Sequence, residues 1–224
     1  MVPKSTGTTR ERLSRDTVVD GAITLADREG LDALTIRRLA QEHGVTPMAL
    51  YWHFHEKEDL LDAVAERLLN GVRLPEPTDA PWAEQLRAIL VAYLDAMRPH
   101  PVLAGLALPR VLKSEPGLRL ADRVLGLLAA AGFGTEEASQ TGSFLLSAMS
   151  TLITAEPGPH KALRGEERDA AVRAKRASLG ALSPARFPHV IAAADALSDC
   201  PDDDVYYARG VELLVRGAQN LRPA

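Results

Sequence analysis

The sequence predicts an all-α protein, and three observations support that fold class. Ala and Leu supply most of the apolar residues, and both favour helices. Aromatic residues make up only 4% of the chain, and no long alternation of Val, Ile and Thr indicates a strand. Apolar residues instead recur at steps of three and four, the period of an amphipathic helix. With 224 residues, 46% of them hydrophobic, the chain is large enough for one or two packed domains.

The N-terminal residues predict two helices behind a short arm. Residues 1–13 are polar, and we expect them to form a flexible basic arm. A helix is expected from Ser14, whose hydroxyl can cap its first turn, to Gly30. A second, shorter helix is expected from Thr35, another capping side chain, to Gly44.

Two further helices are expected to complete the N-terminal part. Thr46 can cap a helix whose first position is Pro47, where the missing N–H of proline has no cost. This third helix is expected to end near His53. A fourth is expected over residues 57–69, where leucine and valine recur at helical spacing.

Prolines at positions 75, 77 and 81 predict a boundary, followed by a second set of helices. These helices are expected over residues 82–97, 102–108, 117–131, 136–156 and 205–219. The helix over 136–156 is apolar or small nearly all round, so more than one of its faces must be buried. Residues 158–201 contain a charged segment over 164–176 and a proline-broken segment around Phe187 and Val190, and an acidic tract follows at 202–204. No helix is assigned to residues 158–201.

Charge and composition exclude several classes of protein. The net charge of −4 and the isoelectric point near 5.9 exclude a wholly basic coat or tail. The single Cys200 excludes an intramolecular disulfide and a zinc site built from cysteines. No signal peptide is recognisable, and the longest nearly apolar run, residues 144–155, is too short to cross a bilayer. We expect a cytoplasmic protein without a membrane contact or a cofactor.

The spacing over residues 36–53 fits a helix-turn-helix. Leu39 is apolar, Ala40 is small where two helices would touch, and Gly44 stands at the left-handed turn. Leu50 and Phe54 are expected to point inward. The rest of the third helix then exposes small, aromatic and weakly polar side chains, a surface suited to a major groove. These side chains are Thr46, Met48, Ala49, Tyr51, Trp52 and His53.

Residues 34–45, 50–54 and 57–61 together resemble the DNA-binding domain of the tetracycline-repressor (TetR) family. More weakly, Pro81-Trp82 and the segments 98–101, 131–133 and 185–188 resemble the C-terminal domain of the tetracycline repressors. The resemblance implies an all-helical homodimer with an N-terminal three-helix helix-turn-helix domain and a larger helical ligand-binding and dimerisation domain. We place the arm at 1–13, the helix-turn-helix domain at 14–60, and the effector-binding and dimerisation domain at 61–224.

The resemblance also implies roles for individual residues on double-stranded operator DNA. Arg37 would read a base, because a guanidinium can donate two hydrogen bonds to guanine. Pro47, Met48 and Ala49 stand where relatives often carry polar residues, which favours apolar contacts with thymine methyl groups. The expected DNA-binding residues are Thr35, Arg37, Arg38, Thr46, Pro47, Met48, Ala49, Tyr51, Trp52, His53 and Lys57.

The charge of the N-terminal 60 residues argues mildly against DNA binding. They carry eight Lys and Arg against ten Asp and Glu, a net charge of −2. Counterion release depends on the groups that touch phosphate rather than on this sum. We therefore expect seven cations to face the DNA while the acids face away. These cations are Lys4, Arg10, Arg12, Arg15, Arg37, Arg38 and Lys57.

The effector is expected to be small and largely apolar. The resemblance places two drug-binding histidines in regions that here read 70–74 and 105–110, and neither histidine is present. Magnesium-tetracycline is therefore disfavoured. His53 and His55 lack a third ligand nearby, so no metal site is assigned. The candidate pocket residues are Met97, His100, Leu103, Leu106, Arg110, Phe144, Ser147 and Met149.

The last helix carries Gly210 and Gly217 two turns apart, which predicts a close neighbour. We expect it to pair with the 136–156 helix and their twofold mates, although packing within one subunit is the alternative. The candidate dimer residues are Leu145, Leu152, Gly210, Leu213, Leu214 and Gly217.

Together these observations predict a ligand-responsive transcriptional regulator, with a repressor favoured. It would bind a pseudo-palindromic operator as a homodimer and be released by its effector. A constitutive DNA-binding protein, or an activator without an effector, is the alternative. An enzyme is disfavoured, because the six histidines and one cysteine form no catalytic or metal-binding spacing.

Overall fold

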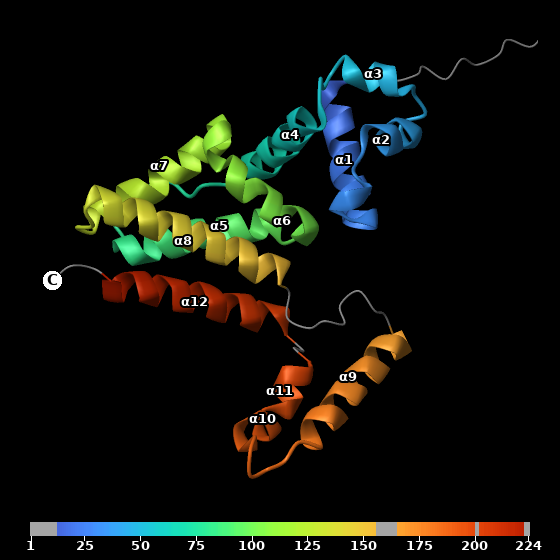
Figure 1. Ribbon diagram of the computed structural model, residues 1–224. Coiled ribbons are helices and arrows are strands. Elements are labelled where there is room, and N and C mark those ends of the chain that lie inside the picture. Colours follow the sequence, from blue (N-terminus) through green and yellow to red (C-terminus); the bar gives the residue numbers. More distant parts are fainter. Residues whose placement is uncertain (1–12, 156–164, 200–201, 222–224) are drawn as a thin grey trace, which may run out of the picture.

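The computed structural model describes residues 13–155, 165–199 and 202–221, and these ranges contain helices and no strand. The all-α prediction is confirmed. Figure 1 shows α1, α2 and α3 as a head at one end, from which α4 runs into a helical core. The arm over residues 1–12, with Lys4, Arg10 and Arg12, lies outside the described residues.

The helices of the head begin after the capping residues and end near the glycines that the sequence analysis identifies. Its elements are α1 (Arg15–Glu29), a 3-10 turn (Leu31–Ala33), α2 (Ile36–Glu42), α3 (Pro47–Tyr51) and α4 (Lys57–Asn70). Ser14 Oγ accepts a hydrogen bond from Thr17 N, and Thr35 Oγ1 accepts one from Arg38 N. Thr46 occupies the cap position of α3, but its hydroxyl makes no capping bond there.

The core contains the expected helices with small shifts of their ends. They are α5 (Trp82–Met97), α6 (Pro101–Ala107), α7 (Glu115–Ala130), α8 (Thr135–Thr154) and α12 (Asp203–Leu221). Between α6 and α7 lies the 3-10 helix η2 (Leu108–Lys113), which the sequence does not predict. Three more helices project from this core as a separate helical extension (Figure 1). They are α9 (Gly165–Gly180), α10 (Pro188–Ala192) and α11 (Ala194–Ser198). No α9 residue is buried, so this helix has no apolar stripe in the sequence to reveal it.

The head and the core share one continuous set of buried residues, from Val18 in α1 to Ala218 in α12. Helix α4 packs against α1 in the head and against α6, α7 and η2 in the core. The expected domain boundary after residue 60 therefore falls inside α4. A movement of α4 would be felt on both sides of that boundary. None of the described helices is long and apolar enough to cross a membrane.

Candidate DNA interface and ligand cavity

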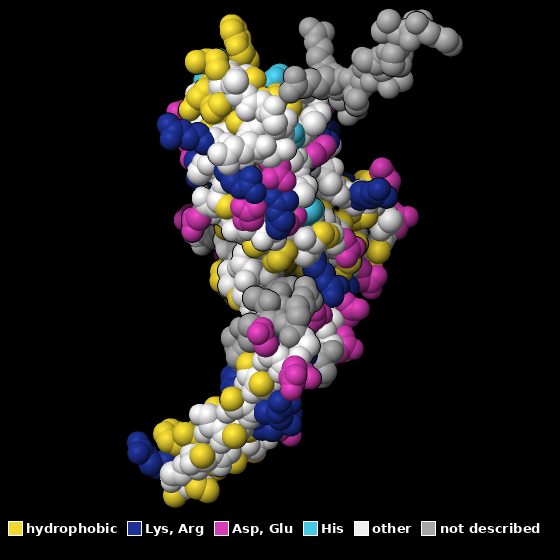
Figure 2. Space-filling view, turned by 90° about the vertical axis from the view of Figure 1, so that its right-hand side faces the viewer, with side chains coloured by type: hydrophobic (Ala, Val, Ile, Leu, Met, Phe, Trp, Pro, Cys, Tyr) yellow, Lys and Arg dark blue, Asp and Glu magenta, His cyan; other side chains and the backbone are white. Residues whose placement is uncertain are grey.

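Helix α3 and the three residues after it divide their side chains sharply between core and solvent. Leu50 and Phe54 are fully buried, as expected, and they anchor the short helix in the head. On the other side, Trp52 is 84% exposed and Met48 is 67% exposed, with Tyr51 also exposed. Figure 2 shows hydrophobic side chains gathered at the tip of the molecule that α3 forms. Exposure of large apolar groups on so short a helix indicates a contact surface.

Cationic side chains of the elements before and after α3 are also exposed. Arg37 on α2 and Lys57 at the start of α4 are exposed. Neither side chain makes a hydrogen bond or an ion pair with the residues that the structure describes. The guanidinium of Arg15, at the start of α1, lies 5.3 Å from the centre of the Phe54 ring.

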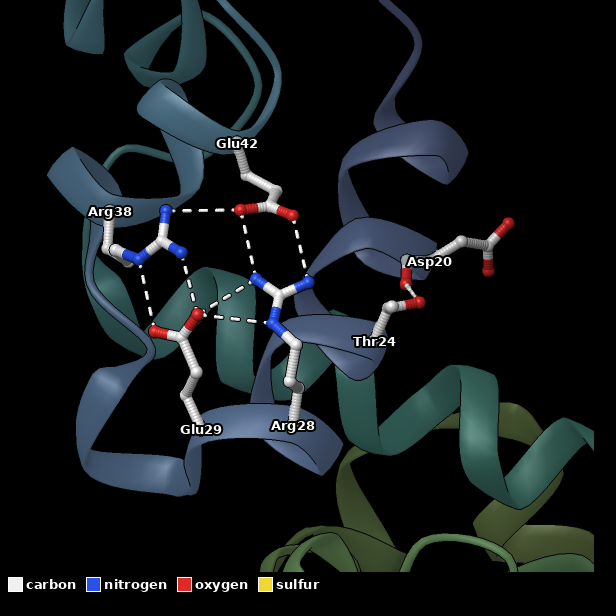
Figure 3. Close-up of polar contacts among 6 residues, drawn as sticks. All are labelled: Asp20, Thr24, Arg28, Glu29, Arg38 and Glu42. Atoms are coloured by element: carbon white, nitrogen blue, oxygen red, sulfur yellow. Dashed lines mark hydrogen bonds and ion pairs between the residues drawn. The ribbon is translucent and has the colours of Figure 1, made fainter.

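The remaining predicted contact residues differ in their exposure. Exposed side chains are those of Thr35, Thr46 and Pro47, while Ala49 and His53 are partly buried. Arg38 is the exception, because its side chain turns toward the end of α1. There it contacts Glu29 and Glu42, and 34% of the side chain remains exposed (Figure 3).

The acids of the head are largely paired, several of them with cations of the core. Arg67 on α4 lies 3.4 Å from Asp16 and 3.2 Å from Asp20. His100 Nδ1, at the start of α6, lies 2.7 Å from Asp27 Oδ2. The sum of charges over residues 1–60 therefore overstates the negative potential, because it leaves out the charge of Arg67, which lies against two of these carboxylates.

A cavity of about 320 Å³ opens between η2, α7 and α8. Its volume is in the range of small-molecule sites. Most of its lining is apolar, and three serines supply the polar groups. The lining residues are Leu108, Val111, Leu112, Ala121, Val124, Leu125, Ser139, Gly142, Ser143, Leu146 and Ser147.

The eight residues predicted for the pocket do not converge on this cavity. Ser147 lines it, but Met97, Leu103 and Met149 are fully buried in the packed interior, and Leu106 is nearly so. The other three point elsewhere. His100 contacts α1, Arg110 contacts α4, and Phe144 is exposed on the far face of α8. The helical spacing of these residues in the sequence indicates which of them face inward. It does not indicate whether the space they face is a cavity or is filled by other side chains.

The short helix η2 touches both the cavity and α4. Leu108, Val111 and Leu112 line the cavity. From the same element, Arg110 Nε donates to Asp62 Oδ1 at 2.7 Å, and Arg110 Nη2 donates to Glu58 Oε2 at 2.5 Å. Only 11% of the Arg110 side chain is exposed. Glu58 follows Lys57, so the contact between Arg110 and Glu58 joins the cavity wall to the edge of the candidate DNA interface.

A groove of about 300 Å³ runs between α8 and α12 on the outside of the subunit. Phe144, Leu213 and Leu221 line it and are exposed, Leu214 is partly buried, and Gly217 has open space around it.

The other predicted dimer residues pack within the subunit. Leu145 is buried, and a Cβ at Gly210 would lie 2.6 Å from Leu152 Cδ2. The two glycines of α12 therefore have different surroundings. At Gly210 the absence of a side chain makes room for Leu152 of the same chain.

Among the described residues, no three side chains of His, Cys, Asp or Glu come together as a group that could hold a metal ion.

Comparisons with known proteins match both parts of this chain. The model of the bacterial regulatory proteins of the tetR family matches residues 18–64, and the model of the tetracyclin repressor-like C-terminal domain matches residues 74–221. The tetracycline repressor protein class A of transposon 1721 from Escherichia coli is 31% identical over 94% of this chain and 93% of its own length.

Solved structures show the same architecture. ActR of Streptomyces coelicolor in complex with actinorhodin has a TM-score of 0.77 and 28% identity, covering 96% of this chain and all of that one. BioQ with its natural double-stranded DNA operator has a TM-score of 0.58 and 26% identity, covering 83% of this chain and 99% of that one. Helix-turn-helix head, helical core and both family models agree, and the chain belongs to the TetR family of DNA-binding transcriptional regulators.

Proposed function

We propose that this chain is a ligand-responsive repressor, which binds a pseudo-palindromic operator as a homodimer and is released by a small, largely apolar effector. The observation that carries the proposal is the exposure of Met48 on α3 and of Trp52 at its C-cap, together with exposed Arg37 and Lys57, which have no ion pair among the described residues. Apolar groups suit thymine methyls, and the two cations suit guanine and phosphate. BioQ, a relative by structure, was solved with an operator duplex.

The effector half of the proposal rests on the cavity between η2, α7 and α8. Its apolar lining favours an apolar ligand, and Ser139, Ser143 and Ser147 offer a few hydrogen bonds. A ligand that binds one arrangement of η2 more tightly than another shifts the population toward it. Since Arg110 ties η2 to Glu58 and Asp62, the shift would reach α4 and thus the head. ActR, also a relative, was solved with actinorhodin.

The homodimer is proposed to form through the groove between α8 and α12. Its exposed Phe144, Leu213 and Leu221 form an apolar surface that a twofold copy could cover. The dimer would place two α3 helices about one helical turn of DNA apart, which requires a pseudo-palindromic site.

The DNA-reading roles are tested with a duplex that the wild-type protein selects from a random pool. Arg37→Ala should lose about 1–3 kcal/mol of discrimination at one base pair, while Lys57→Ala should weaken every sequence alike and flatten the salt dependence. Fluorescence anisotropy on the selected duplex and on a random duplex measures both effects. Equal losses on the two duplexes for Arg37→Ala would contradict its assigned role.

The effector site is tested by screening apolar small molecules for release of the selected duplex. Ser143→Trp fills the mouth of the cavity and should leave DNA binding intact while abolishing release. Ser178→Trp, on an exposed position of α9, is the matched control and should be released like the wild type. A wild-type complex that no compound releases would favour a constitutive DNA-binding protein.

A further inference from the structure

Four charged side chains join the end of α1 to α2 in an alternating ring (Figure 3). Arg28 and Glu29 come from the last turn of α1, and Arg38 and Glu42 from α2. Each guanidinium contacts both carboxylates. Arg28 donates to both oxygens of Glu42 at 3.0 Å and to Glu29 Oε1 at 2.9 Å. Arg38 donates to Glu29 Oε2 at 3.1 Å and Oε1 at 2.6 Å, and its Nη1 lies 3.1 Å from Glu42 Oε2.

The ring keeps all four groups ionised. Hydrogen bonds from Arg38, and next from Arg28, lower the pKa of Glu29 to about 2. The hydrogen bond from Arg28 is the largest cause that lowers the pKa of Glu42. The hydrogen bond to Glu29 raises the pKa of Arg38 above its usual value. Two positive and two negative charges cancel, so the ring as a whole adds nothing to the field that attracts phosphate.

Two further contacts fix α2 against the rest of the head. Thr35 Oγ1 accepts from Arg38 N at 3.1 Å, so Arg38 is held through its backbone as well as its side chain. At the other end of α2, the ring of His43 packs on Gly21 of α1, where a Cβ would lie 2.3 Å from His43 Nε2. Helix α2 therefore has little freedom to roll on α1. Arg37, the neighbour of Arg38, projects from this fixed helix into solvent.

We propose that Arg38 is a positioning residue, which locks α2 to α1 through the ring so that Arg37 is aimed at the DNA, and that Arg38 itself touches no phosphate. This inference rests on the proposed function of the head, and it replaces the direct DNA contact expected for Arg38. Adjacent arginines of one helix then have separate tasks. Arg37 contacts a base of the DNA, and Arg38 fixes the helix that carries Arg37. Because Arg38 is withdrawn from the phosphates, random DNA gains no attraction from it.

The salt dependence of DNA binding separates positioning from phosphate contact. A lost phosphate contact lowers the slope of log K against log salt by about 0.9. Arg38→Met should weaken binding to the selected duplex about tenfold, the scale of a misplaced base contact, and leave the slope unchanged. Lys57→Met should lower the slope and is the positive control. Arg119→Met, on α7 beside Glu115, is the matched control for loss of an exposed ion-paired arginine and should change neither quantity.

Exchanging the signs of all four charges in the ring gives a second test, because the net charge of the protein then stays the same. Arg38→Glu alone sets three carboxylates together and should weaken binding strongly. The fourfold variant Arg28→Glu, Glu29→Arg, Arg38→Glu, Glu42→Arg restores the alternation with the same net charge, and it should recover most of the affinity. Circular dichroism and thermal melting check that each variant is folded.

The outcomes distinguish this inference from the function it rests on. A reduced salt slope for Arg38→Met would overturn the inference, as would a fourfold variant that stays as weak as Arg38→Glu although it is folded. Both results leave the DNA-binding function standing if the wild type still prefers its selected duplex. Selection of no sequence by the wild type would overturn the proposed function and, with it, the positioning role.

Discussion

The groove between α8 and α12 leads to a quantitative prediction for the dimer. Phe144 is 67% exposed in the single subunit. Aromatic side chains bury roughly 150–250 Å² each, so covering the exposed part of Phe144 would remove roughly 100–170 Å² from water in each copy. At about 25 cal/mol/Å² this amounts to about 2–4 kcal/mol per copy. Since a twofold axis repeats the contact, Phe144→Ala should raise the dimer Kd at least about a thousandfold.

Sedimentation or light scattering over a range of protein concentrations measures this Kd. Leu118→Ala is the matched control, because Leu118 is an exposed apolar residue on α7 outside the groove. It should leave the dimer intact. A Phe144→Ala protein that is folded and dimerises as tightly as the wild type would refute the assignment of the groove as the interface.

Three further perturbations test the packing and the charges of the subunit. Gly210→Leu should lower the free energy of unfolding by about 1–3 kcal/mol, because its side chain meets Leu152 of the same subunit, and Leu152→Ala should restore part of the loss in thermal melts. Tyr93→Phe should cost about 1 kcal/mol in urea unfolding, because it removes the buried hydrogen bond between Tyr93 and Ser150, and an unchanged midpoint would contradict this. The ion contacts lower the pKa of Glu29 from 4.5 to about 2, so its ionised form stabilises the head above pH 4.5 and that stabilisation fades as the pH falls toward 2. Melting curves should therefore show wild type and Glu29→Gln converging in acid, and a gap that stays constant with pH would be inconsistent with the ring.

Much of the head could be predicted from sequence because its signals are local. A capping hydroxyl at Ser14 or Thr35 acts on a backbone N–H three residues away, and Gly30 and Gly44 adopt positive φ where their helices end. The same reasoning places Leu50 inside the head, because the helical period leaves no other position for it.

The features that sequence reasoning missed depend on partners far along the chain. Arg37 and Arg38 are the same residue type side by side, and Arg38 is the one that pairs with Glu29 at the end of another helix. Gly210 and Gly217 also look alike, but Leu152 packs against the first and open space surrounds the second. The cavity lies between η2, α7 and α8, and η2 has no sequence signal that predicts it. Tertiary packing, which local spacing does not encode, decides each case.

Sequence selection from a random duplex pool tests the central claim most directly, namely that the exposed face of α3 reads DNA as a dimer. We predict that the wild-type protein enriches an inverted repeat whose half-sites lie about one helical turn apart. Met48→Glu, which puts a carboxylate on the exposed face without touching the core, should enrich no such repeat. If the wild type enriches no sequence, or if Met48→Glu enriches the same repeat equally well, the account is contradicted.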